Sequence, residues 1–534
     1  QHAALWTDSR YFIAAAKELA GSEYQLMKER MAGTPSISEW LASELAEYEN
    51  PIVGVDGSVN TYADVADLKQ SLATKGNMLV RCTDDPMDVL WTDRPVIPNN
   101  KVCLHPLKYA GETTESKLSR IRESLVKQGA DGLLVTALDE IAWVLNLRGS
   151  DVHCNPVFVS YLLISSNNAT LYINREKLSE DVCEYLSTEN IDVEEYESVE
   201  NGLKKYTGKS LLIDVHSTNY TLSTAVDNDK IHVGTSPIPM MKAIKNKVEQ
   251  DGFRAVMLRD GVAMVKFLAW IKGAVEAGGQ TEITLADRLE ALRAEQQHFK
   301  GISFDTIVGY EAHGAIVHYE ATPETDISIE PHGFVLIDSG AQYEDGTTDI
   351  TRTIALGELT DEQRRVYTLV LKGHIQLDLC RFPSGACGSQ IDAIAREPMW
   401  REGYNYLHGT GHGVGSYLNV HEGPHQIRME WRPAPLQAGM TVTNEPGLYL
   451  EGKFGVRIEN TLLIVPAETT AFGDFLKFET LTLAPIDTTP IVLDLLTEEE
   501  RLWINNYHRR VFESLSPYLA GHERKWLEEA TRSI

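Results

Sequence analysis

Hydrophobic residues recur along the chain at two spacings, one typical of helices and one typical of strands. At residues 115–127 the spacing is helical and places Leu118, Ile121 and Leu125 on one face of a predicted helix. The apolar run at residues 132–138 predicts a strand that follows this helix. Helices and strands of this kind in the N-terminal half predict an α/β organisation.

Further apolar runs in the C-terminal half carry acidic residues. Residues 334–343 and 347–353 are β-type runs, and the Glu-Asp-Gly sequence at 344–346 is a hairpin turn signal between them. Asp338 and Asp349 are therefore predicted to lie on neighbouring strands. Because side chains alternate along a strand, both carboxylates can face one cavity.

The residues beside these acids support the same arrangement. Ile337 and Ile350 are expected to point to the packed face of the sheet. Glu459 lies in a strand-like run, residues 456–465, and Glu445 stands before a Pro-Gly pair at a predicted strand end. Four carboxylates are thus predicted to reach one region of the protein.

The end of the chain predicts a further helix. Thr497 and Glu500 have the spacing of a capping box, and apolar residues then recur at helical spacing. These apolar residues are Ile504, Tyr507, Val511 and Leu515. We expect this C-terminal helix to pack on the domain that precedes it.

Loop signals divide the chain into four predicted segments. Their bounds are 1–110, 111–238, 239–488 and 489–534. Residues 53–68 and 211–226 share an apolar strand, an aspartate and a tyrosine six residues after it, which indicates an internal repeat.

Composition narrows the class of protein. The 534 residues, 43% of them hydrophobic, predict two to four domains with sizeable cores. The formal charge of −28 argues against nucleic acid as a partner, because phosphates would be repelled. Apolar stretches are too short for a membrane span, and no signal peptide is recognisable. Six cysteines without a CxxC pair favour a reducing, cytoplasmic location.

The four carboxylates and His412 form a candidate ligand set for two metal ions. Hard oxygen ligands with one nitrogen suit Mn, Mg, Fe, Co or Zn. One ion would leave surplus negative charge, whereas two ions can share bridging carboxylates and hold a hydroxide between them. The alternative, that each acid is a surface residue, is weakened by their apolar contexts.

The chain resembles the pita-bread metallo-aminopeptidases, and among them the long, three-domain aminopeptidase P family. Five motifs carry the resemblance, with the spacings Asp-x10-Asp and Glu-x13-Glu of the candidate ligands. The motifs are WTDSRYF, VTALDEIAWVLNLRGSDVHCNPVF, IVHYE, YLHGTGHGVGSYLNVHEGP and WINNYH. The resemblance implies two creatinase-like α/β domains, a pita-bread catalytic domain and a C-terminal helical extension. The first domain's usual opening strands would be absent, since Gln1 matches its middle.

The resemblance also implies a role for each candidate ligand. Asp338 would bind one metal, Asp349 and Glu459 would bridge both, and His412 and Glu445 would bind the other. Glu445 would in addition accept a proton from the attacking water. The family suggests Mn²⁺ as the metal, with Co²⁺, Zn²⁺ or Fe²⁺ as alternatives.

Three further histidines are candidates for substrate contacts in the catalytic site. By resemblance, His318, His408 and His421 line the substrate site and donate hydrogen bonds to the scissile carbonyl. The alternative for each is a structural hydrogen bond in the core, which is the interpretation we keep for the remaining candidates. These are His313, His332, His374 and His425.

Two other features lie next to the ligands. Arg457 is expected to pair with a ligand carboxylate and to contribute to substrate binding, although a solvated arginine is the alternative. The glycines at 409–415 do not form a phosphate loop, because no Lys-Ser/Thr ending follows them. They are expected to let the backbone pass close to the site.

These observations predict a cytoplasmic, metal-dependent aminopeptidase that removes a residue preceding proline. Its partners would be peptides with proline at the second position and, by analogy, a second copy in a homodimer. A prolidase, which cleaves only dipeptides, and a non-catalytic binding protein of the same fold are the alternatives. Retention of all five ligands argues against the non-catalytic alternative.

Overall fold

The computed structural model of the chain describes residues 2–76, 78–83, 85 and 87–534. The chain forms two compact units. Unit 1 comprises the residues up to Asp8 and residues 21–242, and unit 2 comprises residues 9–20 and 243–534. A short N-terminal stretch therefore belongs to the same unit as the C-terminal half. The finer division at 110, 238 and 488 stays a prediction.

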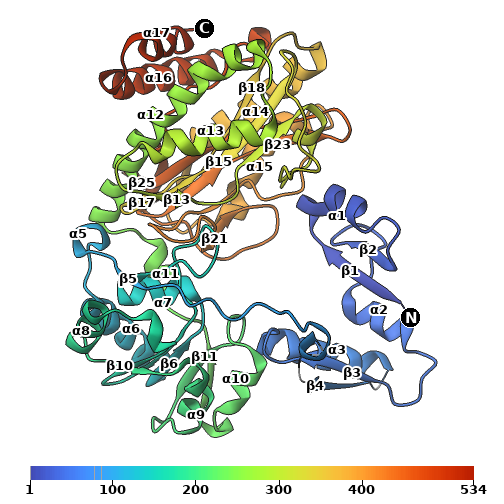
Figure 1. Cartoon of the computed structure of the whole chain (residues 1–534), viewed down its shortest axis with the longest axis vertical. Coiled ribbons are helices and arrows are strands. Elements are labelled where there is room, and N and C mark those ends of the chain that lie inside the picture. The colour runs from blue at the N-terminus through green and yellow to red at the C-terminus, as the bar shows by residue number, and fades with distance from the viewer. Residues whose placement is uncertain (1, 77, 84, 86) are drawn as a thin grey trace. The chain divides into compact units, whose positions relative to one another are not determined.

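Unit 1 is built from helices and strands that alternate along the chain (Figure 1). Its strands are β1 (Ala3–Thr7), β2 (Tyr24–Lys28), β3 (Ile52–Asp56), β4 (Leu79–Thr83), β5 (Cys103–Leu104), β6 (Gly132–Val135), β7 (Leu147–Arg148), β8 (Tyr161–Ser165), β9 (Ala169–Tyr172), β10 (Ile191–Glu194), β11 (Leu211–Asp214) and β12 (Ile231–Gly234). Its helices are α2 (Ile37–Glu44), α3 (Tyr62–Gly76), α4 (Met87–Leu90), α5 (Leu107–Ala110), α6 (Thr114–Gln128), α7 (Leu138–Leu145), α8 (Glu180–Thr188), α9 (Val199–Lys204) and α10 (Tyr220–Ala225). Helix α11 (Ile238–Ala243) leads into unit 2.

The main sheet of unit 1 has six strands in the order β10-β9-β8-β6-β11-β12. Parallel and antiparallel pairs are mixed, since β8 runs antiparallel to both β6 and β9. Helix α6 confirms the helical prediction, with Leu118, Ile121 and Leu125 all buried. The predicted strand at 132–138 is shorter than expected. It ends at Val135, because helix α7 begins at Leu138.

The two repeated segments adopt the same local structure. In the first, β3 leads into α3, and in the second, β11 leads into α10. The loops between strand and helix also pair with each other, since Thr61 and Asn219 form an antiparallel bridge. The structure therefore supports the internal repeat inferred from sequence.

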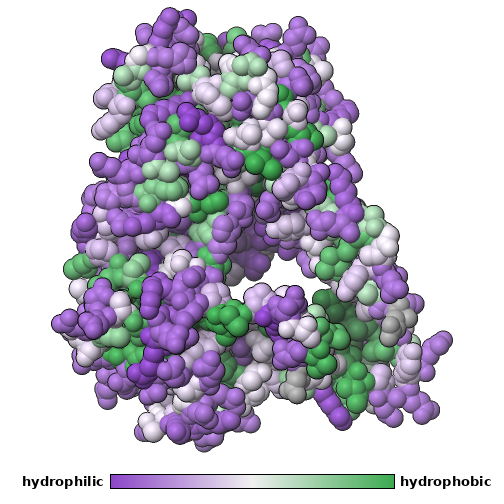
Figure 2. Space-filling view, in the orientation of Figure 1, coloured by the Kyte–Doolittle hydropathy of each residue, from purple (hydrophilic) through white to green (hydrophobic). Residues whose placement is uncertain are grey.

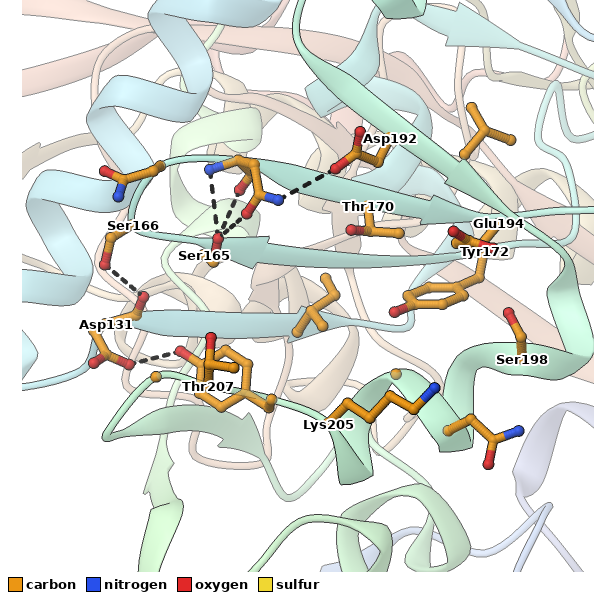
Figure 3. A pocket seen from close by; sticks show the side chains of 18 residues that line it. Asp131, Ser165, Ser166, Thr170, Tyr172, Asp192, Glu194, Ser198, Lys205 and Thr207 are labelled. Atoms are coloured by element: carbon orange, nitrogen blue, oxygen red, sulfur yellow. Dashed lines mark hydrogen bonds between the residues drawn. The ribbon is translucent and has the colours of Figure 1, made fainter.

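A polar groove of about 880 Å³ opens beside β8 and β9 in unit 1 (Figure 3). Asp131 lies at its edge and accepts hydrogen bonds from the Tyr206 hydroxyl at 2.6 Å and from the backbone amides of Lys209 and Ser210 at 2.8 and 3.1 Å. The carboxylate thus ties the loop before β11 to the start of β6. Its hydrogen bonds are structural.

Unit 2 contains the remaining elements. Its helices are α1 (Phe12–Glu18), α12 (Lys247–Ala277), α13 (Glu282–Ala294), α14 (Asp361–Asp378), α15 (Gly388–Trp400), α16 (Glu498–Leu515) and α17 (Gly521–Ala530). Its strands are β13 (Phe299–Ile302), β14 (Ile307–Tyr310), β15 (Phe334–Ser339), β16 (Ala341–Tyr343), β17 (Gly346–Thr347), β18 (Ile350–Ala355), β19 (Arg381–Pro383), β20 (Gly411–Gly413), β21 (Glu422–Ile427), β22 (Thr441–Asn444), β23 (Gly447–Leu450), β24 (Phe454–Arg457), β25 (Asn460–Thr470) and β26 (Gly473–Thr480).

The strands of unit 2 form several short antiparallel sheets, including β14-β15-β18 and β19-β26-β25-β22. Along β15 the side chains alternate. Val335 and Ile337 join a core with residues of α12 and α13, together with Ile350 from β18. Leu336 faces the other way, into a separate apolar cluster. Asp338 shares the face of Leu336, so the predicted separation of acid and isoleucine is confirmed.

Two acids lie just outside the strands on which they were predicted. Asp349 immediately precedes β18, and the residue opposite Asp338 in the pairing register is Thr351. The strand predicted at 456–465 is interrupted at Ile458 and Glu459, so the assignment of Glu459 to a strand is wrong. The physical reason is a change of partner: β24 pairs with β23, whereas β25 pairs with β22 and β26.

The C-terminal helix follows the sequence prediction closely. Thr497 caps α16 and Glu500 completes the capping box. The four residues predicted at helical spacing are all buried in a core that α16 shares with α14 and β24. They are Ile504, Tyr507, Val511 and Leu515.

Surface and covalent features agree with the composition. Polar residues cover most of the face visible in Figure 2. None of the helices in the described part of the chain is long and apolar enough to cross a membrane. All six cysteines fall among the described residues, and no disulfide joins them.

Candidate metal centre

Asp338 is held from one side by Arg457. The guanidinium donates to Asp338 Oδ2 through Nη2 at 2.7 Å and Nε at 3.2 Å. The other oxygen, Oδ1, is buried without a hydrogen-bond partner among the described residues. Since a buried carboxylate oxygen needs a donor or a cation, Oδ1 is suited to bind a metal. The ion pair predicted for Arg457 is thereby confirmed.

Asp349, His412 and Glu459 meet although they come from separate segments. Their ligand atoms all lie within 4.8 Å of one another. The turn that carries Glu459 is fixed by its own backbone amide, which donates to the Thr351 carbonyl at 3.1 Å. Asp349 and Glu459 are both buried, with 4% and 1% of their surface exposed. The interruption of the strand at Glu459 therefore places this carboxylate close to Asp349.

His412 lies on the short strand β20, and its two ring nitrogens have different surroundings. Nδ1 lies 2.9 Å from the Gly413 carbonyl oxygen and donates to it, which leaves Nε2 with its lone pair. Nε2 is 3.4 Å from Asp349 Oδ2 and 3.5 Å from Glu445 Oε1. These spacings fit ligands that share one ion ~2.0–2.2 Å from each.

Glycine allows β20 to approach strand β22 closely. A Cβ on Gly411 would lie 1.9 Å from the Thr443 carbonyl oxygen. Thr443 is also near Glu445, whose Oε1 accepts a hydrogen bond from the threonine hydroxyl at 3.3 Å. The backbone amide of Glu445 donates to the Thr410 carbonyl at 2.8 Å. The glycine-rich run thus brings His412 beside Glu445, at the end of β22 as predicted.

The electrostatics of the centre require further positive charge. Burial and the neighbouring Asp338 raise the pKa of Asp349 well above its ordinary value. Burial raises the pKa of Glu445 to about 8, and burial with Asp349 raises the pKa of Glu459 strongly. One guanidinium, Arg457, cannot neutralise four carboxylates. Divalent cations would hold these acids ionised, so the donor set fits two such ions.

The three candidate histidines lie around the centre in different settings. His421 packs against His412, with ring centroids 4.3 Å apart. His318 is near Asp338 and Arg457, and burial lowers its pKa to about 4. Both lie near candidate ligands, and their roles stay predictions.

His408 differs because both of its ring nitrogens are engaged. Nδ1 is 2.7 Å from the Gly409 carbonyl oxygen, and Nε2 is 2.8 Å from the Tyr449 hydroxyl. The same hydroxyl accepts a hydrogen bond from Arg457 Nη1 at 2.8 Å. His408 is therefore linked to Asp338 through Tyr449 and Arg457. Its predicted donation to substrate stays a prediction.

Sequence reasoning missed Tyr449 and Thr351. The Thr351 hydroxyl donates to Glu459 Oε2 at 2.7 Å and lies 3.2 Å from Arg457 Nε. Thr351 is two residues after Asp349, and Tyr449 is four residues after Glu445. Their proximity in sequence was the available signal. They fix the orientation of ligand side chains.

The remaining histidines make contacts away from the ligands. His313 pairs with Glu282 at 3.0 Å, and His332 lies against Tyr310. His374 and His425 are both buried. A ring nitrogen of His374 lies 3.1 Å from the Asn444 carbonyl oxygen, and one of His425 lies 2.7 Å from the Thr441 carbonyl oxygen. These contacts agree with the structural interpretation.

Three family models match successive parts of the chain. Metallopeptidase family M24 matches residues 251–466, which contain every candidate ligand. The creatinase/prolidase N-terminal domain matches residues 93–249, and the C-terminal region of peptidase M24 matches residues 474–534. The fold class predicted from sequence is confirmed, with a creatinase-like N-terminal part, an M24 catalytic domain and a C-terminal region.

Named relatives align over the full chain. Aminopeptidase P1 of Arabidopsis thaliana is 38% identical, with coverage of 100% of this chain and 90% of the relative. A probable Xaa-Pro aminopeptidase P of Paracoccidioides brasiliensis is 41% identical with the same coverage. Both alignments extend through the N-terminal segments as well as the catalytic segment.

Solved structures match the chain over different lengths. The X-prolyl aminopeptidase of Caenorhabditis elegans, described as a cytosolic enzyme with a di-nuclear active site, matches with a TM-score of 0.95 and 35% identity over 100% of this chain and 89% of its own. The Xaa-Pro dipeptidase of Bacillus anthracis matches with a TM-score of 0.56 and 25% identity, over 70% of this chain and 99% of its own. Sequence and structure together establish that the chain belongs to the aminopeptidase P family of the M24 metallopeptidases.

Proposed function

We propose that the protein is an aminopeptidase that hydrolyses the bond between an N-terminal residue and a following proline, using two divalent metal ions. The convergence of Asp349, Glu445 and Glu459 on Nε2 of His412 carries this conclusion. The unpartnered Oδ1 of Asp338 adds a buried oxygen that a cation would satisfy. The named relatives, Xaa-Pro and X-prolyl aminopeptidases, support the substrate class.

Each ligand has a role consistent with its position. Asp338 would hold one ion, Asp349 and Glu459 would be shared by both ions, and His412 and Glu445 would hold the other ion. When bound, the two ions would polarise the scissile carbonyl and lower the pKa of the attacking water. Mn²⁺ is our first assignment, with Co²⁺, Zn²⁺ and Fe²⁺ as alternatives.

Side chains of the protein transfer the proton and stabilise the negative charge on the carbonyl oxygen. Glu445 accepts a proton from the attacking water and returns it to the proline nitrogen as the C–N bond breaks. His318 and His421 donate hydrogen bonds to the carbonyl oxygen as it gains negative charge. Arg457 keeps Asp338 oriented through two hydrogen bonds. His408 supports the same arrangement through Tyr449.

Proline requires a dedicated site. Its nitrogen in a peptide bond has no hydrogen, and the ring fixes φ, so an extended substrate pose with a full set of backbone hydrogen bonds is unavailable. Specificity must therefore come from a pocket that accepts the ring. An aminopeptidase must also leave room beyond the proline, whereas a dipeptidase must close that space.

A peptide panel with metal analysis tests the proposal. Purified protein loaded with Mn²⁺ should cleave Xaa-Pro-Xaa peptides at least as efficiently as the matching Xaa-Pro dipeptides, because contacts beyond proline add binding in the transition state. Cleavage of dipeptides alone would make it a prolidase. Equal cleavage of peptides without proline would overturn the specificity. Elemental analysis should find two ions per chain.

Association and location form a separate part of the proposal. We propose a homodimer with two-fold symmetry, the commonest closed arrangement, and a cytosolic location. The location is supported by the absence of disulfides among the described cysteines and by the cytosolic C. elegans relative. Light scattering at micromolar concentration should give twice the mass of the 59.6 kDa chain, and a monomer mass would contradict the dimer.

A further inference from the structure

The WTDSRYF motif near the N-terminus lies far in sequence from the residues of the catalytic centre. It spans residues 6–12. From Ser9 onward the chain belongs to unit 2, and this part of it continues to residue 20. Ile13 and Ala14 of α1 pack against a cluster that includes Leu336 of β15. Leu336 lies on the same face of β15 as Asp338, so α1 packs on the side of the sheet that carries the ligand.

This packing places Tyr11 against a candidate catalytic histidine. The Tyr11 hydroxyl lies 3.0 Å from His318 Nδ1. The two rings also meet edge to face, with centroids 5.2 Å apart and an interplanar angle of 89°. Such a contact restrains rotation of the imidazole in two ways, through a hydrogen bond and through ring packing.

The surroundings of His318 favour a neutral ring. Burial, Arg10 and Arg457 lower the pKa of His318 to about 4, so the ring is neutral at neutral pH. A neutral imidazole has one N–H and one acceptor nitrogen. If the tyrosine O–H donates to Nδ1, the single ring proton lies on Nε2. That nitrogen can then donate to a substrate oxygen.

We propose that Tyr11 is a positioning residue for the peptidase reaction: its hydroxyl holds the His318 ring with Nε2–H turned toward the scissile carbonyl. The proposal rests on the proposed peptidase function and extends it to a residue more than three hundred positions away in sequence. The side-chain contacts recorded for Tyr11 are with His318 and Arg10, so Tyr11 acts through His318. The N-terminal segment is thereby a part of the catalytic apparatus.

The hydroxyl of Tyr11 can be removed by substitution without loss of its ring. Tyr11 is 39% exposed, and Tyr11→Phe removes only its hydroxyl while the ring contact with His318 is kept. Loss of a group that orients a functional imidazole typically lowers activity by ~10-fold to ~100-fold. We expect that loss in kcat for Tyr11→Phe, with KM and metal content nearly unchanged. Tyr24→Phe, on an exposed tyrosine of unit 1, is the matched control.

A double-mutant cycle tests whether Tyr11 acts through His318. In the His318→Ala background, Tyr11→Phe should cause no further loss, because the group that it positions is gone. An equal loss in both backgrounds would show that Tyr11 acts independently, and full kcat in Tyr11→Phe alone would also overturn the proposal. A purely structural role would lower the melting temperature, which should not change.

Crystal structures of the wild type and Tyr11→Phe with metals bound provide a readout that does not depend on the substrate. The His318 ring should have one orientation in the wild type and several, or a rotated one, in the variant. An unchanged single orientation would overturn the positioning role even if Xaa-Pro peptides were cleaved. If the wild type cleaves no such peptide, the proposed function fails, while the crystallographic comparison still decides the role of Tyr11.

Discussion

Tyr62 and Tyr220 stack on each other across the two repeated segments of unit 1, with ring centroids 5.8 Å apart and an interplanar angle of 18°. Their backbones are linked reciprocally. The Tyr62 amide donates to the Thr218 carbonyl at 3.0 Å, and the Tyr220 amide donates to the Asn60 carbonyl at 2.9 Å. Each tyrosine occupies the same place in its repeat, so the contact relates the repeats by an approximate two-fold symmetry.

This symmetry predicts that the loop before α3 and the loop before α10 open together. Tyr62→Ala should remove a ring contact worth about 1 kcal/mol. Native-state hydrogen exchange should then be faster by about fivefold at the Tyr220 amide, which is on the other repeat. Tyr24→Ala is the control and should leave that amide unchanged. Unchanged exchange at Tyr220 in Tyr62→Ala would show that the stacking does not couple the loops.

The bridging ligands lead to a second prediction. Asp349→Ala and Glu459→Ala should each abolish peptidase activity, because each removes a carboxylate assigned to both ions. Weaker metal binding would leave the remaining carboxylates to repel one another. Elemental analysis should show that less than two ions remain. Asp131→Ala, in the polar groove of unit 1, is a control in which metal content should not change. An active Asp349→Ala enzyme would refute the two-metal assignment.

The two histidines beside the ligands give a third prediction. His318→Ala and His421→Ala should lower kcat by ~10²–10³, the range found when one donor to the developing oxyanion is removed. Both variants should retain two ions, since neither ring is assigned as a ligand. His425→Ala does not serve as a control, because that ring is buried. Loss of metal from either variant would identify the histidine as a ligand.

The local contexts of the candidate ligands are distinctive, and the structure brings Asp349, His412 and Glu459 together. Apolar alternation around Asp338 and Ile337 correctly separated the polar and packed faces of β15. The turn after Glu445 was also readable, since Pro and Gly cannot continue a paired strand easily. Family motifs then connected residues that local patterns leave independent.

Other parts of the site depend on tertiary contacts that no local pattern contains. Glu459 is predicted to be a strand residue because the run 456–465 is rich in apolar residues, yet the chain changes sheets there. The hydrogen bonds of Tyr449 to His408 and Arg457 join three segments. The approach of Tyr11 to His318 likewise follows from the packing of α1 on the catalytic sheet. Such contacts become visible only when the chain is folded.

Asp378 provides a prediction on pH that is independent of the metal ligands. It lies at the end of α14 and accepts hydrogen bonds from Trp503 Nε1 at 2.7 Å and from the Thr480 hydroxyl at 2.8 Å. Burial raises its pKa from an ordinary value of 3.8 to about 6. The protonated Asp378 carboxyl therefore contributes stability that is present in full below the pKa of the unfolded state. This contribution is lost as the pH rises through the pKa of the folded state.

Asp378→Asn removes this titration because the amide is neutral throughout. The melting temperature of the variant relative to the wild type should therefore increase between about pH 5 and about pH 7.5, since only the wild type must ionise a buried carboxyl. Asp494→Asn, at an exposed position near the same C-terminal region, is the matched control and should give the same difference at both pH values. A relative melting temperature of Asp378→Asn that stays constant, or that falls as the pH rises, would show that burial does not raise this pKa.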